Sequence, residues 1–454
     1  MSMGLLVGGI YFLFLGDYKE KLKNLKSNPI FLLLFSFYLL HIIGILWSSD
    51  ISDGLNEIRQ KSTLAIIPII LFSSVHHSKK SFNWVKIIFL STLFLTSLIN
   101  FIGYHLYFEE LGLKETRNMS LFIGHIRYAL VIALAAVWCF YEFTLKSTFS
   151  NSYFILFCWF SFYTIQSQVL SGILGIGLGL LFLSIWILIK KRKWFYLITF
   201  SSLGLFAMLS IIYYLSLPIR IPSEVIAMNS QNKLAWESKS NVSLDGNDIK
   251  GQPIQFTLNR YLFSLDLPLN SDGIDKLSSK DIQNIENGVA DIHEVEWPFL
   301  SRLYEIRYEI QVETDPNLHP ILERLELWDN CLHTINKYWV FGVGTGGIKN
   351  VLDKSYEERN SPLEKTRRLK PHNTYLTYWL TFGIFGILFI IFLLSYFGLI
   401  AIKANFPLGV IFILIVSSSF LSEDTLDSQA GITFFTFFFS LFGLEIYRKI
   451  IEKK

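Results

Sequence analysis

The sequence has little charge. Asp, Glu, Lys and Arg make up only 17% of its 454 residues, whereas 52% are hydrophobic. Average soluble domains carry about 25% charged residues, so this composition excludes an ordinary soluble protein. The net charge of +3 is too small to indicate a nucleic-acid partner, because such partners call for a strongly basic chain.

Cysteine is also scarce. The three cysteines give no disulfide framework, because Cys139 and Cys158 lie in apolar runs and Cys331 has no evident partner. A cleavable signal peptide is not evident, since the first apolar run, 3–16, lacks a basic leading region and a small-residue cleavage site. That run is short for a membrane span. We therefore expect it to be an incomplete span, or a helix to be missing before it.

Long apolar runs are what the sequence does contain. A helix needs about 20 apolar residues to cross about 30 Å of hydrocarbon. We predict a polytopic α-helical membrane protein with about 11–12 transmembrane helices. The runs of spanning length are 29–47, 84–104, 119–141, 152–169, 170–189, 194–216, 373–402, 405–421 and 429–446. The shorter candidates are 3–16 and 62–75.

The connecting loops predict the orientation of these spans. Lys and Arg are in excess on the cytoplasmic side of a membrane, so the Lys-rich loops 19–26 and 190–193 are placed inside. Strict alternation then agrees with every other loop and places the first residue outside. We predict three parts: an N-terminal transmembrane bundle (1–216), a large periplasmic loop domain (217–371) and C-terminal transmembrane helices (372–454).

The large insert differs in composition from the rest of the chain. It is polar, and Ile254–Leu258 alternates as a strand does, while 293–312 fits either a strand or a helix. An amphipathic helix is predicted near 320–336, because Pro320 is a good first helical residue. Its expected apolar stripe, with spacings of three and four, is Leu325, Trp328, Leu332, Ile335 and Trp339.

Arg324 and His372 are candidate site residues beside the membrane. Arg324 could bind phosphate through its fork of donors, or it could be a solvated helix residue paired with Glu323 or Asp329. His372 directly precedes a predicted span. It could act as a general base near neutral pH, or it could simply be an interfacial residue near a helix start.

A second pair of candidates, His125 and Arg127, lies early in the span 119–141. An arginine inside a membrane is costly, so a functional role is the first hypothesis and snorkelling to the interface the alternative. The glycine-rich stretch 342–347 lacks the Lys-Ser/Thr ending of a phosphate loop. We expect it to be a tight turn, although its N–H groups could face an anion.

Charged residues also gather in the outer loops. We expect the acidic turn with Glu423, Asp424 and Asp427 to be solvated, rather than to bind a divalent cation or a sugar hydroxyl. The outer cations form either a phosphate-binding surface or ordinary interface anchors. They are Arg59, Lys61, Arg367, Arg368 and Lys370. We predict no metal site and no cofactor.

The order and spacing of four short motifs, together with the topology, resemble the O-antigen ligase family. The motifs are Arg324-Leu-Glu-Leu-Trp328, Phe341-Gly-Val-Gly-Thr-Gly-Gly347, Pro371-His-Asn-Thr-Tyr375 and Thr381-Phe-Gly-Ile-Phe-Gly386. That family includes O-antigen ligases, O-antigen polymerases and bacterial O-linked oligosaccharyltransferases. The resemblance is most specific over 324–386, and it extends more loosely through 47–68, 125–128 and 422–431 in the style of Bacteroidetes-type members.

The resemblance implies an inverting, metal-independent glycosyltransferase in the bacterial inner membrane. The donor would be a glycan on undecaprenyl diphosphate, and the acceptor a hydroxyl group on the periplasmic face. His372 and Arg324 match the family's histidine and arginine. The family's arginine at the start of a mid-chain span is absent from 169–174, so either Arg127 or Arg59 replaces it or this member is altered in activity. The substrate-binding candidates, for diphosphate or glycan, are Arg127, His125, Arg59, Asn373 and Tyr375.

The residues do not choose the acceptor. Lipid A-core, a second lipid-linked glycan and a protein Ser or Thr are all hydroxyl acceptors, and ligation to lipid A-core comes first only as the family's usual label. A lipid-linked glycan flippase or transporter is the main alternative from another class, and a structural or assembly protein is the third. Transporters often contain two related halves, and no such halving is visible in this sequence.

Overall fold

The computed structural model describes residues 8–10, 12–14, 16–73, 78–107, 119–146, 149–219, 226–295, 298–311, 315–317 and 319–452. Within these ranges every regular element is an α or 3-10 helix, and the only strand-like pairing is an isolated bridge between Asn247 and Pro253. The protein is a polytopic helical membrane protein, as its composition predicts.

Seven helical segments of the described chain are long and apolar enough to cross a membrane. They are α3 with η1 (Pro29–Trp47), α6 (Lys79–Tyr107), α7 (His125–Thr144), α9 (Leu170–Lys190), α10 (Trp194–Ser216), α18 (Thr374–Lys403) and α20 (Gln429–Ile451).

The helices are shorter than the apolar runs at three predicted spans. The runs 62–75, 152–169 and 405–421 correspond to helices of 11, 17 and 16 residues. These helices are α5 (Thr63–Ser73), α8 (Ser150–Gln166) and α19 (Pro407–Ser422). Each falls short of the about 20 residues that a crossing needs, because apolar residues in the flanking turns lengthen the run without lengthening the helix. Half of the predicted span 3–16 lies outside the described residues.

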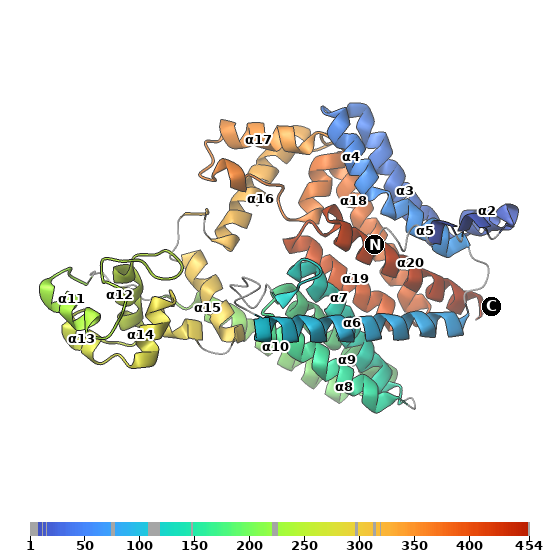
Figure 1. Cartoon of the computed structure of the whole chain (residues 1–454). Coiled ribbons are helices and arrows are strands. Elements are labelled where there is room, and N and C mark those ends of the chain that lie inside the picture. Colours follow the sequence, from blue (N-terminus) through green and yellow to red (C-terminus); the bar gives the residue numbers. More distant parts are fainter. Residues whose placement is uncertain are drawn as a thin grey trace. The chain divides into compact units, whose positions relative to one another are not determined.

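The chain divides into two compact units, Met1–Ser202 with Pro316–Lys454, and Leu203–Asp315. In the first unit, helices from opposite ends of the sequence lie side by side: α20 packs against α5, and α19 packs against α7 and α9 (Figure 1). Aromatic rings fill the centre of this bundle. Phe412 of α19 contacts Phe435, Phe438 and Phe442 of α20 at ring-centroid distances of 5.8–6.3 Å.

Side-chain caps fix where the helices around the polar end of this bundle begin. Asn373 caps α18 by accepting a hydrogen bond from the Leu376 N–H, and Ser428 caps α20 by accepting one from the Gly431 N–H. Short polar side chains are favoured at this position because they satisfy N–H groups that have no partner within the helix. The residues just before these helices are thereby held in defined positions.

The glycine-rich stretch is a tight turn, as predicted, and it packs against a kink in α18. Gly342 and Gly383 both have positive φ, and an added Cβ would lie 2.4 Å and 2.0 Å from backbone atoms across the contact. The alternative that its N–H groups face an anion does not hold for the residues from 342 to 346. Their N–H groups donate to Tyr338 O, Leu380 O, Thr381 O, Gly44 O and Ser48 Oγ.

Two shorter helices complete the polar part of the first unit with a 3-10 turn: α16 (Pro320–Tyr338), α17 (Ile348–Glu358) and η4 (Lys365–Arg367). Helix α16 begins at Pro320, as predicted, but the expected apolar stripe is rotated. Leu325, Leu332 and Trp339 are exposed, whereas the buried face carries Leu327, Asn330, Cys331, Thr334 and Ile335. A buried polar residue is tolerated on this face because the side-chain oxygen of Asn330, Oδ1, accepts a hydrogen bond from the Ser355 hydroxyl at 2.8 Å.

The second unit is a small helical domain with its own core. Its elements after α10 are α11 (Ser230–Glu237), α12 (Ile254–Ser264), α13 (Ser271–Asp275), α14 (Ser279–Glu286), η3 (Ile292–Val295) and α15 (Pro298–Gln311). The strand-like interpretation of Ile254–Leu258 is wrong. Ile254, Leu258, Tyr261 and Leu262 are fully buried, a helical spacing that five residues were too short to distinguish from alternation. The ambiguous stretch 293–312 is helical in its described part.

Candidate active site

Two arginines share one buried carboxylate at the polar end of the bundle. Arg324 of α16 contacts Glu423 Oε1 at 2.7 Å, and Arg127, in the first turn of α7, lies 3.4 Å from Glu423 Oε2. Glu423 follows α19 and is only 4% exposed. The Arg127 Nε–H also donates to the Ser428 hydroxyl at 3.2 Å. The Arg324 side chain is 34% exposed and the Arg127 side chain is 25% exposed, so a ligand can still reach both.

This pairing shows which carboxylate each arginine contacts, while their roles stay predictions. The expected partners of Arg324 on its own helix are occupied elsewhere, because Glu323 binds Arg367 and Asp329 binds Arg359. Arg127 is held by Glu423 rather than left to reach the interface alone. Both arginines are therefore parts of one charged cluster.

His372 lies in the segment that joins η4 to α18, beside this cluster. Its Nδ1 is 3.8 Å from Asp424 Oδ2, and the charges that face it also include Glu423, Glu323 and the two arginines. Burial lowers the pKa of His372. The carboxylate of Glu423 acts to raise this pKa, and the guanidinium groups of Arg324 and Arg127 act to lower it. The imidazole is therefore neutral at pH 7 and can accept a proton. Burial also raises the pKa of Glu423, although the two guanidinium groups oppose this shift.

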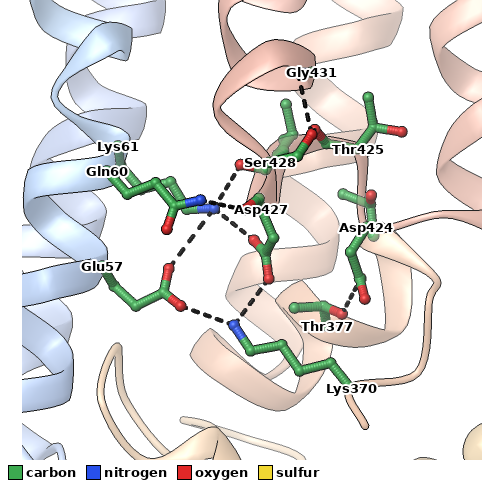
Figure 2. A network of polar contacts seen from close by, with 12 residues as sticks. Glu57, Gln60, Lys61, Lys370, Thr377, Asp424, Thr425, Asp427, Ser428 and Gly431 are labelled. Carbon is green, nitrogen blue, oxygen red and sulfur yellow. Dashed lines mark hydrogen bonds and ion pairs between the residues drawn. The ribbon is translucent and has the colours of Figure 1, made fainter. Parts of the chain in front are cut away.

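The expectation of a solvated acidic turn is wrong. Glu423 and Asp424 are 4% and 6% exposed, and Asp427 keeps only 17% of its side chain accessible. Asp427, in η5 (Thr425–Asp427), binds Lys61 through Oδ1 at 2.5 Å and Lys370 through Oδ2 at 2.9 Å. Figure 2 shows the Asp427 carboxylate between the ammonium groups of Lys61 and Lys370, so cations from other parts of the chain replace water around it.

A four-residue ionic network results from these contacts. Lys370 reaches Glu57 of α4 (Ile51–Lys61) at 2.8 Å, and Lys61, on the same helix, is only 2% exposed (Figure 2). Burial acts to raise the pKa of Asp427, but Lys370 and Lys61 reverse this and hold that pKa below its usual range. The two carboxylates in turn raise the pKa of Lys370 against its burial. Both shifts favour the charged forms of Asp427 and Lys370.

Asp424 lies between the two clusters. Its Oδ1 accepts a hydrogen bond from the buried Thr377 hydroxyl at 2.6 Å (Figure 2). Burial and the nearby charge of Asp427 raise the pKa of Asp424 to about 6, although the Thr377 hydrogen bond and the lysines oppose the shift. A carboxyl group with this pKa, 3.8 Å from a neutral histidine, places two proton-accepting groups side by side.

The family model for O-antigen ligase matches residues 153–391, more than half of the 454-residue chain. The chain belongs to the O-antigen ligase family. Members are glycan-transferring membrane enzymes that act on lipid-linked glycans, so the cluster around His372 is a candidate active site of that kind. The match is to the family as a whole and favours no lineage subtype or acceptor. No curated protein matches the chain.

The matched region of this O-antigen ligase family member contains Arg324 and His372, whereas Arg127 and Glu423 lie outside it. Arg127 comes from the helix that packs on the segment lacking the family's mid-chain arginine. An added Cβ at Gly172 of α9 would lie 2.9 Å from Ala129 Cβ, half a turn beyond Arg127 on α7. Helix α7 thus packs on 169–174 through Ala129, while the Arg127 side chain contacts Glu423 and Ser428. The replacement of the family's arginine by Arg127 stays a prediction.

The remaining predicted substrate-binding residues lie apart from the cluster or use their polar atoms within the fold. The Asn373 amide caps α18 and also donates to Leu421 O at 3.0 Å, and the Tyr375 hydroxyl donates to Ser417 O at 3.2 Å. His125 begins α7 and lines a small cavity with Tyr128 and Tyr163. Arg59 lies in the last turn of α4 and has no ion pair among the residues that the structure describes.

His41 is a buried polar residue that the sequence analysis missed. It lies on α3, its Nε2 is 3.1 Å from the Tyr378 hydroxyl, and its Nδ1 is 2.8 Å from Phe37 O. A cavity of about 10 Å³, room for one water molecule, separates it from Lys61, Lys370 and Asp427. The signal was available, because an ionisable residue inside a predicted span is a functional candidate by default.

Metal ligation has no support in the described part of the chain. Among those residues, no group of three or more His, Cys, Asp or Glu side chains could hold an ion. The acidic residues of the site instead face arginine and lysine side chains.

Proposed function

We propose that the protein transfers a glycan from undecaprenyl diphosphate to a hydroxyl acceptor on the periplasmic face of a bacterial inner membrane. Ligation of O-antigen to lipid A-core is the first choice of reaction. The observation that carries the proposal is the neutral, partly exposed His372 beside two arginines that share one carboxylate. A base and a pair of fixed cations are what this reaction needs.

Arg324 and Arg127 would bind the diphosphate. Guanidinium groups match phosphate oxygens with parallel donors, and partial burial strengthens the attraction by excluding water. Glu423 holds both arginines in place before the donor arrives. As the bond from the anomeric carbon to the phosphate oxygen breaks, negative charge grows on the leaving diphosphate, and the arginines stabilise it. We propose that this replaces a metal ion.

His372 would take the proton from the acceptor hydroxyl. The hydroxyl oxygen then forms the new bond to the anomeric carbon, on the side opposite the departing diphosphate, which inverts that carbon. Holding base, donor and acceptor in line converts their encounter into a single positioned step. A neutral imidazole is required for this, and the lowered pKa of His372 supplies it.

The charge distribution of the loops supports a periplasmic site. His372 precedes α18, Glu423 follows α19 and Arg127 lies at the start of α7, so all three belong to the same end of the bundle. The Lys-rich loops 19–26 and 190–193 belong to the other end. Because Lys and Arg are in excess on the cytoplasmic side, the His372 end faces outward.

The test is genetic complementation in the native host. The gene is deleted and restored as wild type, His372→Ala or Arg324→Ala, with each protein quantified in the membrane. We expect only the wild type to restore long-chain lipopolysaccharide, and the variants to accumulate lipid-linked glycan. Full rescue by His372→Ala at normal membrane level would refute the role of this histidine.

The same gels distinguish the acceptors. Lipopolysaccharide with a single repeat in the deletion strain would indicate a polymerase, and loss of glycoprotein bands would indicate protein glycosylation. Transport of the lipid-linked glycan by purified protein, without transfer, would replace the enzyme proposal with a flippase.

A further inference from the structure

His372 has an unfavourable backbone conformation. Its φ is +47°, in the left-handed region that residues with a Cβ seldom adopt. Such a conformation costs about 1–3 kcal/mol and persists only where the surroundings impose it. The question is which contacts impose it here.

The residues on either side of His372 each form a hydrogen bond to another element. The Trp328 indole N–H donates to Pro371 O at 2.7 Å, and the Asn373 amide donates to Leu421 O at 3.0 Å. These bonds fix the carbonyl before the histidine and the first turn of α18 after it. In the segment that leads from η4 to Pro371, Leu369 O accepts a hydrogen bond from the Tyr356 hydroxyl at 2.9 Å.

Lys370 ties the same segment to two more elements. Its ammonium group, two residues before His372, contacts Glu57 at 2.8 Å and Asp427 at 2.9 Å, which lie on α4 and on η5 (Figure 2). Lys61 binds the other oxygen of Asp427 at 2.5 Å and also donates to Leu426 O at 2.7 Å. Two cations and two anions therefore form a closed, neutral network that ties the segment to both ends of the chain.

The charges that shift the pKa of His372 most are Glu423, Arg324, Arg127 and Glu323, and no member of the network is among them. The charge of Lys370 instead lowers the pKa of Asp424, whose Oδ2 lies 3.8 Å from His372 Nδ1. The direct connection between Lys370 and His372 is the backbone. A displacement of about 1 Å in a catalytic group can lower a rate about 100-fold, so a backbone tether is sufficient to affect the reaction.

We propose that Lys370 is a positioning residue for the glycan transfer: its ion pairs with Glu57 and Asp427 hold the backbone of His372 where the imidazole lies beside Arg324 and Arg127. The inference rests on the proposed function, because it assigns to Lys370 the placement of the proposed base. It assigns no contact with donor or acceptor to Lys370 itself.

The experiment compares Lys370→Met with Lys337→Met in the purified full-length protein. Lys337 forms a similar 2.8 Å pair with Glu358, but on the surface and away from the site. Donor and acceptor lipids extracted from the deletion strain serve as substrates. We expect Lys370→Met to lower kcat roughly 10- to 100-fold while the donor KM stays within about twofold, and Lys337→Met to match wild type.

The pH profile separates positioning from electrostatics. Because Lys370 acts through the backbone, the acid limb of the rate profile of Lys370→Met stays at the wild-type pH. A displaced limb would show that the ammonium group acts on the pKa of His372 and would overturn the proposal.

A double variant separates positioning from general stability. Lys370→Met leaves two buried carboxylates with one cation, whereas Glu57→Gln with Lys370→Met restores a neutral network of Lys61 and Asp427. We expect the double variant to regain the thermal midpoint of wild type but to keep the lowered kcat, and residues 366–373 to exchange amide hydrogens faster. Recovery of kcat together with stability, or unchanged exchange, would overturn the proposal.

The His372→Ala variant distinguishes failure of the proposed base from failure of the proposed positioning by Lys370. A fully active His372→Ala protein would refute the proposed base, and with it the target of the positioning. An inactive His372→Ala protein beside a fully active Lys370→Met protein would refute only the role of Lys370.

Discussion

Asp424 offers a test of how the fold controls charge at the site. We predict that Asp424→Asn stabilises the protein at pH 8. The carboxyl group is 6% exposed, and burial with the nearby Asp427 raises its pKa from 3.8 to about 6. Because one pKa unit is equivalent to about 1.4 kcal/mol, keeping this group ionised in the folded state costs about 3 kcal/mol. Asparagine removes that cost and can still accept the Thr377 hydrogen bond.

The sign of the effect depends on pH in a defined way. Below about pH 3 the carboxyl is protonated in both the folded and the unfolded chain, and at pH 4 the variant and the wild type still differ in stability by less than about 1 kcal/mol. As pH rises from 4 to 6, the unfolded chain releases its proton first, and the wild type loses stability relative to the variant. Above about pH 7 the difference reaches its full value of about 3 kcal/mol.

Thermal unfolding in detergent, followed by tryptophan fluorescence at pH 4 and pH 8, measures this difference. We expect the midpoint of Asp424→Asn to exceed that of wild type by a few degrees at pH 8 and by much less at pH 4. Asp329→Asn is the control, because the Asp329 side chain is 63% exposed. A lower midpoint at pH 8, or an equal shift at both pH values, would show that the Asp424 carboxyl is not strained by burial.

Three further predictions concern charge and backbone geometry. Glu423→Gln should move the acid limb of the rate profile to lower pH and Arg127→Gln should move it to higher pH, because the two charges shift the pKa of His372 in opposite directions. Initial rates between about pH 5 and 8 test this, and shifts of the same sign would contradict it. Lys61→Met should lower the free energy of unfolding by about 3–5 kcal/mol, because the Lys61 side chain is 2% exposed, whereas Lys337→Met, at an exposed pair, should lower it by less than about 1 kcal/mol. Thermal midpoints measure both losses, and equal losses would argue against a buried network. Gly383→Ala should lower the free energy of unfolding by about 3 kcal/mol or more, because the φ of Gly383 is +64° and the new Cβ would lie 2.0 Å from Val340 O. Gly398→Ala on the same helix should be tolerated, because open space surrounds Gly398, and equal membrane levels of the two variants would refute this prediction.

Sequence patterns predicted the elements that depend on local chemistry. The membrane class follows from composition, because uncharged apolar runs of spanning length have few alternatives to a membrane helix. The start of α16 at Pro320 and the tight turn at 342–347 follow from the restricted or permissive backbones of proline and glycine. The motifs around Arg324 and His372 carried the family resemblance, because they lie within one continuous stretch of 63 residues, 324–386. This stretch falls inside the region that the family model matches.

Charge pairing was beyond the reach of the sequence. Glu423 lies 99 residues from Arg324 and farther still from Arg127, and no local pattern states that they meet. The acidic turn after α19 has the composition of a solvated loop, and only the arrival of cations from α4, α7 and α16 makes it buried. Lys61 and Lys370 likewise gave no sign that they share Asp427.

By itself, the sequence determined that the chain spans a membrane, that a polar insert precedes its last helices, and that it resembles O-antigen ligases, because apolar length, backbone-restricting residues and contiguous motifs are local properties. Only the tertiary structure decided which cations meet which carboxylates, since packing brings α4, α7, α16 and the turn after α19 to one end of the bundle. Protonation of His372 and Asp424 depends on burial and on those neighbours, so the chemistry of the site is a property of the fold.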